Sequence, residues 1–260
     1  MRRYLAKKLI FVLILIFLVS PFFVFADSQG EVRTFFVDPL YDFQQREQIS
    51  ATLKRVSQRA YFYIETDWYR NLTEGEKSLI NQNLKILAEE FDTKIYPTLT
   101  SIYGSEWKPG IDSDSRITVL FHQIRKEAAG YFNNGDEYPR VQNQTSNQRE
   151  MVYLNSDSLK EVLLAESYLS HEFTHLITFN QKERLQGVQE EVWLNEARAE
   201  YAPTLLGYDE EYQGSNLQQR VKQFLSSPSD SLTEWLNQKK DYGVINLFIQ
   251  YLVDHYGVEI

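Results

Sequence analysis

The 260-residue chain contains no cysteine and only four histidines. Without cysteine it has no disulfide framework, no thiolate nucleophile and no thiolate metal site. Any metal ion must therefore be held by histidine and carboxylate side chains. Basic residues are outnumbered, with 27 Lys and Arg against 36 Asp and Glu, and the isoelectric point is near 5.1. Because no face rich in Lys or Arg is present, nucleic acid is not an expected partner.

The chain also lacks the composition of a disordered protein, since 43% of its residues are hydrophobic and 14% are aromatic. No internal repeat and no linker divides it. We therefore expect residues 27–260 to form one domain with a sizeable core.

The N-terminus has the features of a signal peptide. Four basic residues precede an apolar run from Leu9 to Phe25, and Ala26 ends a stretch that a signal peptidase recognises. The run is about 17 residues long, which is short for a membrane-spanning helix. We predict cleavage after residue 26 and a secreted protein with no stable membrane association. The alternative is an uncleaved segment that anchors the protein at the outer face of the membrane. An exported chain without cysteine favours a bacterial source.

Hydrophobic periodicity predicts an α+β fold, with strands mostly in the first part and helices after it. The expected strands cover 34–37, 60–65, 116–124 and 151–154, and a polar loop of about 25 residues precedes the last. The expected helices cover 44–57, a segment capped by Thr73, 157 or 158 to about 179, 190 to about 206, and 244–256. The chain ends at Ile260 in an apolar continuation, so we expect the C-terminal helical part to be incomplete.

The segment His171-Glu172-Phe173-Thr174-His175 has the spacing HExxH inside a predicted helix. One helical turn places the two imidazoles about 5–6 Å apart at Cβ, where both can bind one zinc ion. Glu172 projects beside the same face, where it can deprotonate a water. Polar histidines on an amphipathic helix are the alternative, but two of four histidines in this pattern make chance a poor explanation.

A third ligand is offered by Glu196 in the segment Trp193-Leu194-Asn195-Glu196. A carboxylate there would complete three protein ligands and leave a fourth zinc position open, as catalysis requires. Glu200 lies four residues on, so it shares the helix face and can accept the free N–H of a histidine ligand. The alternative is a solvated charged face.

These two segments resemble the gluzincin metallopeptidases, the class that contains thermolysin and the zinc aminopeptidases. The closer similarity is to the hyicolysin-type secreted bacterial metallopeptidases. It extends to the stretches PGIDSDSRITVLF (109–121), GYFNNGDEYP (130–139), EMVYLNSD (150–157) and SHEFTHLITFNQK (170–182). The resemblance implies a two-lobed zincin-like domain with zinc on His171, His175 and Glu196 and with Glu172 as general base. The chain departs from the usual NEG at Ala197, and Arg198 is bulkier than expected.

The resemblance further implies that a strand ahead of the zinc helix pairs with an extended peptide substrate. The candidate is the strand Met151, Val152, Tyr153 and Leu154, with an ordinary paired strand as the alternative. An oxyanion donor is expected besides the metal, with Tyr242 as first choice and His255 as second. His122, within a strand, is expected to be structural.

Acidic residues in loops are candidates for calcium, since their oxygens suit a hard cation. These residues are Asp112, Asp114, Asp136 and Glu137. Because no EF-hand pattern is present, solvated turns are the alternative.

We therefore expect a secreted zinc endopeptidase acting on peptides or proteins. Two alternatives remain open. The departures at Ala197 and Arg198 are compatible with an exported binding protein on an inactive zincin scaffold. A zinc aminopeptidase is the other, although no segment resembling GxMEN precedes the zinc helix.

Overall fold

Short β-branched and aromatic runs form the strands of a mixed sheet. The computed structural model describes residues 26–125 and 128–258, so the predicted signal peptide lies outside it apart from Ala26. Within these ranges the six-stranded sheet has the order β1-β2-β3-β4-β6-β5. The strands are β1 (Val32–Phe36), β2 (Gln48–Val56), β3 (Ala60–Glu65), β4 (Ile117–His122), β5 (Gly130–Phe132) and β6 (Met151–Asn155).

The pairing directions divide the sheet into a parallel centre and antiparallel margins. Strands β3, β4 and β6 run parallel, whereas β1 and β2 join on one side and β5 on the other as antiparallel strands. Strand β6 is therefore paired on both sides, and β5 forms the edge of the sheet next to it.

The segment predicted as a helix over residues 44–57 is instead the strand β2, so that prediction is wrong. Its buried side chains alternate, with Ile49, Ala51 and Leu53 facing the core. An alternation with period two buries one face of a strand and cannot make a helical stripe. Pairing with β1 and β3 then fixes the extended form.

The helices follow the predicted order, with additions. They are α2 (Thr66–Arg70), α3 (Glu74–Glu90), α4 (Tyr96–Tyr103), α5 (Val162–Thr178), α6 (Val192–Leu205), α7 (Asn216–Ser226) and α8 (Lys239–Tyr256). The capping box predicted for α3 is confirmed, because Thr73 and Glu76 exchange side chain to backbone hydrogen bonds. A short 3-10 turn over Ser156–Lys160 precedes α5, which therefore starts later than predicted.

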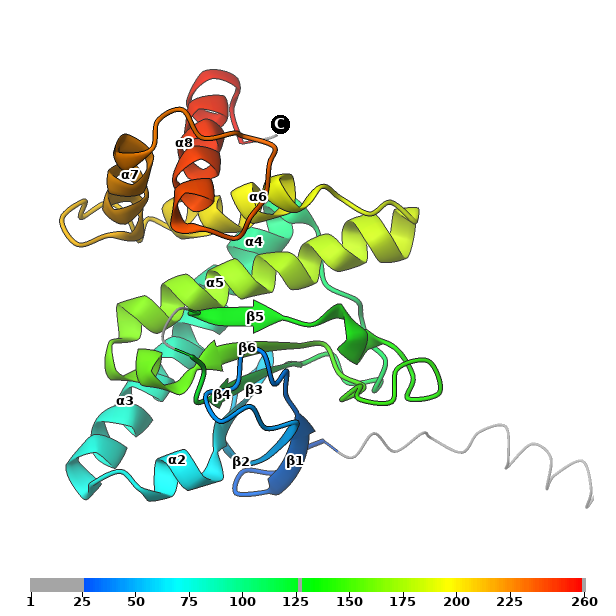
Figure 1. The fold of residues 1–260 in the computed structure, drawn as a ribbon. Helices are drawn as coiled ribbons and strands as arrows, with labels where there is room; N and C mark the ends of the chain where they lie inside the picture. The colour runs from blue at the N-terminus through cyan, green and yellow to red at the C-terminus, as the bar shows by residue number, and fades with distance from the viewer. Residues whose placement is uncertain (1–25, 126–127, 259–260) are drawn as a thin grey trace, which may run out of the picture.

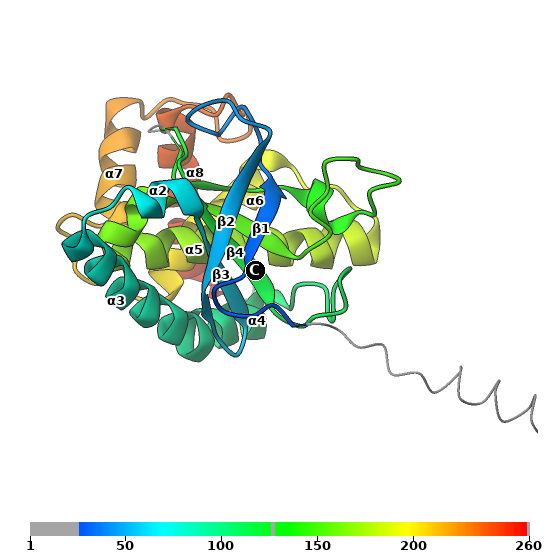
Figure 2. The same cartoon turned by 90° about the horizontal axis from the view of Figure 1, so that it is seen from below.

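Helix α5 occupies the centre of the molecule, with the sheet on one side and α6, α7 and α8 on the other (Figure 1). The larger core packs α3, α4 and α5 against one face of the sheet, around Phe91 and Phe173. A smaller core on the opposite face joins β1 and β2 to the central strands. Strands β1 and β2 face the viewer in Figure 2. A side chain of α5 that faces α6 is therefore held between the sheet and the C-terminal helices.

The fold is α+β with a mixed sheet, as the hydrophobic pattern predicted. None of the helices in the described residues is long and apolar enough to cross a lipid bilayer.

Candidate metal centre

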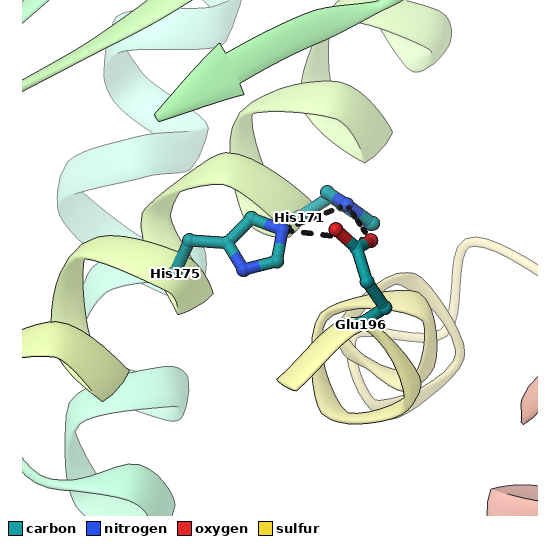
Figure 3. Close-up of side chains that lie close together, drawn as sticks. All are labelled: His171, His175 and Glu196. Carbon is teal, nitrogen blue, oxygen red and sulfur yellow. Dashed lines mark hydrogen bonds and ion pairs between the residues drawn. The ribbon is translucent and has the colours of Figure 1, made fainter. Parts of the chain in front are cut away.

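Two histidines of α5 and one glutamate of α6 point toward one another (Figure 3). His171 and His175 are one turn apart, and their Nε2 atoms lie 3.1 Å from each other. Oε2 of Glu196 is 3.5 Å from Nε2 of His171 and 3.7 Å from Nε2 of His175. Among residues 26–125 and 128–258 this is the one group of three or more side chains placed to hold a metal ion. The structure thus brings together the three predicted ligands.

Neighbouring side chains fix the protons of the two imidazoles. Nδ1 of His175 donates to Oδ1 of Asn195 over 3.0 Å, and Nδ1 of His171 lies 3.5 Å from Oε1 of Glu200. With its proton on Nδ1, each neutral ring presents the lone pair of Nε2 to the other ring and to Glu196. Asn195, which directly precedes the predicted ligand Glu196, was not among the predicted site residues.

When both rings are neutral in this way, the three converging atoms are all acceptors and no proton lies between them. Oε2 of Glu196 is buried and has no hydrogen-bond partner. Such an arrangement is unfavourable by itself, because buried acceptors require a donor or a cation. Two nitrogens bound to one tetrahedral zinc ion at about 2.0–2.1 Å lie about 3.3 Å apart, close to the observed spacing. The donor set fits zinc.

Glu200 connects this centre to the C-terminal helices. Its carboxylate receives two hydrogen bonds of 2.6 Å from Nε and Nη2 of Arg220 in α7. Asn216 donates to the same carboxylate, and Asn246 of α8 donates to the backbone carbonyl of Glu200. These contacts hold Glu200 beside His171. Arg220 was missed, because a single arginine carries no sequence pattern.

The two departures from the expected motif are accommodated. Ala197 is fully buried, so its small side chain lets α6 pack closely. Arg198 turns away from the metal ligands and makes a forked ion pair with Glu190. Neither side chain enters the group of ligands.

Glu172 lies beside the ligands and under the edge strand β5. Its side chain is buried, and a Cβ on Gly130 would come within 2.9 Å of its Cγ and Oε1. Glycine at this position therefore lets the strand pass directly over the carboxylate. Burial, assisted by the charges of Glu196 and Glu200, raises the pKa of Glu172 to about 8. A cation on the ligands would oppose this shift.

The charges around the two histidines act in opposite directions. Burial alone lowers the pKa of His171, but the adjacent Glu196 and the other nearby carboxylates raise it to about 9. Burial lowers the pKa of His175 despite the charge of Glu196. The pKa of Glu196 is also lowered, because its attraction to the two imidazoles outweighs burial. These shifts favour a proton held between His171 and Glu196, which a metal ion on the same ligands would replace.

The strand predicted to form the substrate edge does not lie at an edge. Met151, Val152, Tyr153 and Leu154 belong to β6, which pairs with β4 and β5. The order of strands in a sheet depends on contacts between distant segments and cannot be predicted from one strand alone. Strand β5 lies within the predicted polar loop, and its three residues are too few to form a recognisable strand pattern. The edge strand closest to Glu172 is β5.

Of the two predicted oxyanion donors, only Tyr242 lies near the centre. Burial and the charges of Glu196 and Glu200 raise its pKa. Its hydroxyl donates to Asn237 over 3.0 Å, and its ring faces the guanidinium of Arg220. His255 is exposed near the opposite end of α8, about 20 Å further along the axis, so that prediction is wrong.

A second tyrosine near the centre was missed. Tyr41 stacks on Tyr131 of β5 with ring centroids 4.5 Å apart. Burial, followed by the charges of Glu172, Asp38 and Glu196, raises its pKa. It comes from a loop far away in sequence, with no motif around it.

His122 has the structural role that was predicted. It is fully buried, with Nε2 3.3 Å from the hydroxyl of Tyr131 and Nδ1 3.4 Å from Oδ2 of Asp42. It therefore takes no part in the metal centre.

The residues predicted for calcium do not form one ligand group within the described ranges. Asp114 accepts a hydrogen bond from Tyr61, and Asp112 accepts one from the amide of Asp114. Asp136 accepts from Tyr153 and from the amide of Asn147. These partners already satisfy the three aspartates.

A scan against models of protein families finds no match to this chain, and a search of curated proteins finds no significant match.

Proposed function

We propose that this protein is a zinc-dependent peptidase that is exported from the cell and hydrolyses peptide bonds. The observation that carries the proposal is the convergence of three ligand atoms, one each on His171, His175 and Glu196, with the buried carboxyl group of Glu172 beside them. Three protein ligands leave one position open in a tetrahedral zinc site, which is typical of catalytic centres. The resemblance to the gluzincins favours the same activity.

A zinc ion held there would polarise the scissile carbonyl and lower the pKa of water at the site toward about 7. Side chains of the protein carry out the proton transfers and orient the ligands. Glu172 accepts a proton from the attacking water on a carboxylate oxygen and passes it to the leaving amine. Asn195 and Glu200 hold the two histidine rings through their Nδ1 atoms, which preserves the orientation of the ligands.

The free edge of β5 is the surface that we propose for the substrate backbone. Strand β5 pairs with β6 on one side only, and Gly130 at its start lies over Glu172. An extended peptide added to this edge would be bound through main-chain hydrogen bonds, whatever its side chains. The scissile bond would then pass the general base.

Tyr242 is the side chain that we propose as donor to the oxyanion of the tetrahedral intermediate. Tyr41 is a second candidate, since the charge of Glu172 acts on it as well. The two tyrosines come from different parts of the chain, so replacing each by phenylalanine tests their roles separately. The more important donor is the one whose loss lowers kcat more than it raises KM.

The proposal is tested by Glu172→Gln. General acid–base catalysis contributes about 10²–10⁴ in rate, so we expect a loss of that size in peptide hydrolysis with zinc still bound. The matched control is Glu161→Gln, at the exposed N-cap of the same helix, which should cleave at the wild-type rate. Cleavage by Glu172→Gln at the wild-type rate would contradict the mechanism.

An N-terminally acetylated peptide distinguishes the two kinds of peptidase. An endopeptidase cleaves it internally, whereas an aminopeptidase requires the free amine. We expect internal cleavage. Tight binding of such peptides by the wild-type protein without any cleavage would instead support a binding protein.

A further inference from the structure

Three buried glutamates lie in neighbouring segments beyond the C-terminal end of α5, apart from the metal centre. Glu106, Glu137 and Glu150 are 1%, 4% and 2% exposed. They come from different segments, namely the loop after α4, the 3-10 turn Asn134–Glu137 and the residue before β6. The charges of Glu106 and Glu150 raise the pKa of Glu137, and the charge of Glu106 raises that of Glu150, so the three carboxyl groups lie within electrostatic range of one another.

The carboxylate of Glu137 has no partner at all. Both of its oxygens are buried without a hydrogen bond, and so is Oε2 of Glu150. The other oxygen of Glu150 accepts from the amide of Ile111 over 2.9 Å. Gly110 leaves room for this carboxylate, since a Cβ there would overlap Oε2 of Glu150. Buried carboxylates without partners cost several kcal/mol, so they require compensation.

The neighbouring cations compensate only part of this charge. Lys108 lies 3.4 Å from Glu106, which also accepts from the hydroxyl of Tyr96. Arg184 lowers the pKa of Glu137, but its guanidinium stacks on the ring of Trp107. Within the described residues neither it nor any other cation forms an ion pair with Glu137 or Glu150.

Protonation would relieve the charge without solving the problem. Burial and the charge of Glu150 raise the pKa of Glu137 to about 9, and burial raises that of Glu150 to about 7. A protonated Glu137 would lose its charge, but its carbonyl oxygen would still lack a donor, since neither oxygen has a hydrogen-bond partner. A bound cation satisfies both the charge and the free lone pairs.

We propose that Glu137 and Glu150 are ligands of a calcium ion. All free donor atoms are oxygens, which a hard cation prefers. Calcium accepts irregular shells of six to eight oxygens, completed by peptide carbonyls and water, whereas magnesium demands a nearly ideal octahedron. The ion would tie together three segments that only loops connect, at the opposite end of β6 from the start of α5. The site does not depend on the proposed peptidase activity.

Calcium titration of the whole protein, loaded with zinc to fill the other centre, tests this proposal. Calorimetry should give about one calcium per chain, with a Kd of about 10⁻⁴–10⁻³ M or tighter. Binding should vanish in Glu137→Gln and in Glu150→Gln, and persist in Glu89→Gln, an exposed glutamate of α3. Equal binding by all four proteins, or no saturable binding by the wild type, would overturn the proposal.

Thermal unfolding is a second test of calcium binding, and it does not depend on peptidase activity. Calcium should raise the unfolding temperature of the wild type and leave that of Glu137→Gln unchanged. Without calcium, Glu137→Gln should unfold no earlier than the wild type, since it replaces a buried carboxyl group that has no hydrogen-bond partner. An unfolding temperature clearly below that of calcium-free wild type would show that Glu137 is stabilising without a cation, which contradicts the proposal.

Discussion

The chain buries histidines in two places, and their surroundings differ in how the ring nitrogens are used. Both nitrogens of His122 lie near a partner, one at the hydroxyl of Tyr131 and the other at Asp42. At the metal centre, the Nδ1 atoms of His171 and His175 have partners, but their Nε2 atoms face each other and the free oxygen of Glu196. The carboxylate beside His122 is paired with an arginine, although Nδ1 makes no hydrogen bond, whereas no lysine or arginine of the described residues forms an ion pair with Glu196.

The carboxylates beside these histidines differ in the same way. Asp42 accepts hydrogen bonds from Nε and Nη2 of Arg46, which also reaches Glu65. Near the metal centre, Arg220 forms its ion pair with Glu200 and not with the ligand Glu196. The surplus of acceptors, rather than histidine burial as such, distinguishes a candidate metal site from a structural network.

The largest effect on stability should come from the structural network. Asp42→Asn removes the charge that pairs with Arg46, and breaking a buried ion pair costs about 3–5 kcal/mol. We expect about 3 kcal/mol by urea unfolding, because Arg46 is a quarter exposed. Zinc binding should be unchanged. The control is Asp67→Asn, in an exposed pair with Arg70, which should change the free energy of unfolding by less than about 1 kcal/mol.

A smaller effect is expected at the metal centre from Glu200→Gln. The amide keeps the shape of the side chain but is a weaker acceptor for Nδ1 of His171. Loss of such a partner costs about 10–100-fold in metal affinity, measured by competition with a chelator. Replacement of Asp42 should leave this affinity unaltered. If Glu200→Gln bound zinc as tightly as the wild type, the carboxylate would have no role in positioning the ligand.

The smallest effect is a dependence of stability on acid pH. Burial by itself would raise the pKa of Asp42, but the adjacent His122 and hydrogen bonds from Arg46 lower it below the ordinary value of 3.8. A lowered folded-state pKa stabilises fully above the ordinary value, and this stabilisation is lost as the pH falls through the lowered one. Unfolding free energies of wild type and Asp42→Asn should therefore converge below about pH 3. Parallel curves would contradict this role of Asp42.

The sequence was sufficient to predict the elements that carry the candidate site. Helices α5 and α6 follow from apolar periodicity, and the HExxH spacing together with the glutamate of the next helix predicts His171, His175 and Glu196 as ligands. The capping box gave the start of α3, and the continuous apolar run gave β4. In each case the signal lies within about one helical turn or one strand of sequence.

The rest depends on contacts between distant segments. Strand pairing converted 44–57 from a predicted helix into β2, and strand order placed β6 inside the sheet. Tyr41 and Arg220 approach the centre from a loop and from α7, neither of which has a local pattern. The predicted choice of His255 failed because α8 is straight and long enough to carry it away from the centre that Tyr242 approaches.

The zinc content of the purified protein, measured by elemental analysis, tests the central claim most directly. We predict about one zinc per chain in the wild type and in His122→Asn, and close to none in His171→Ala. A folded wild-type protein that contains no zinc and takes up none when it is supplied would contradict the account. Equal zinc content in His171→Ala and the wild type would also contradict it, because the metal would then be bound elsewhere.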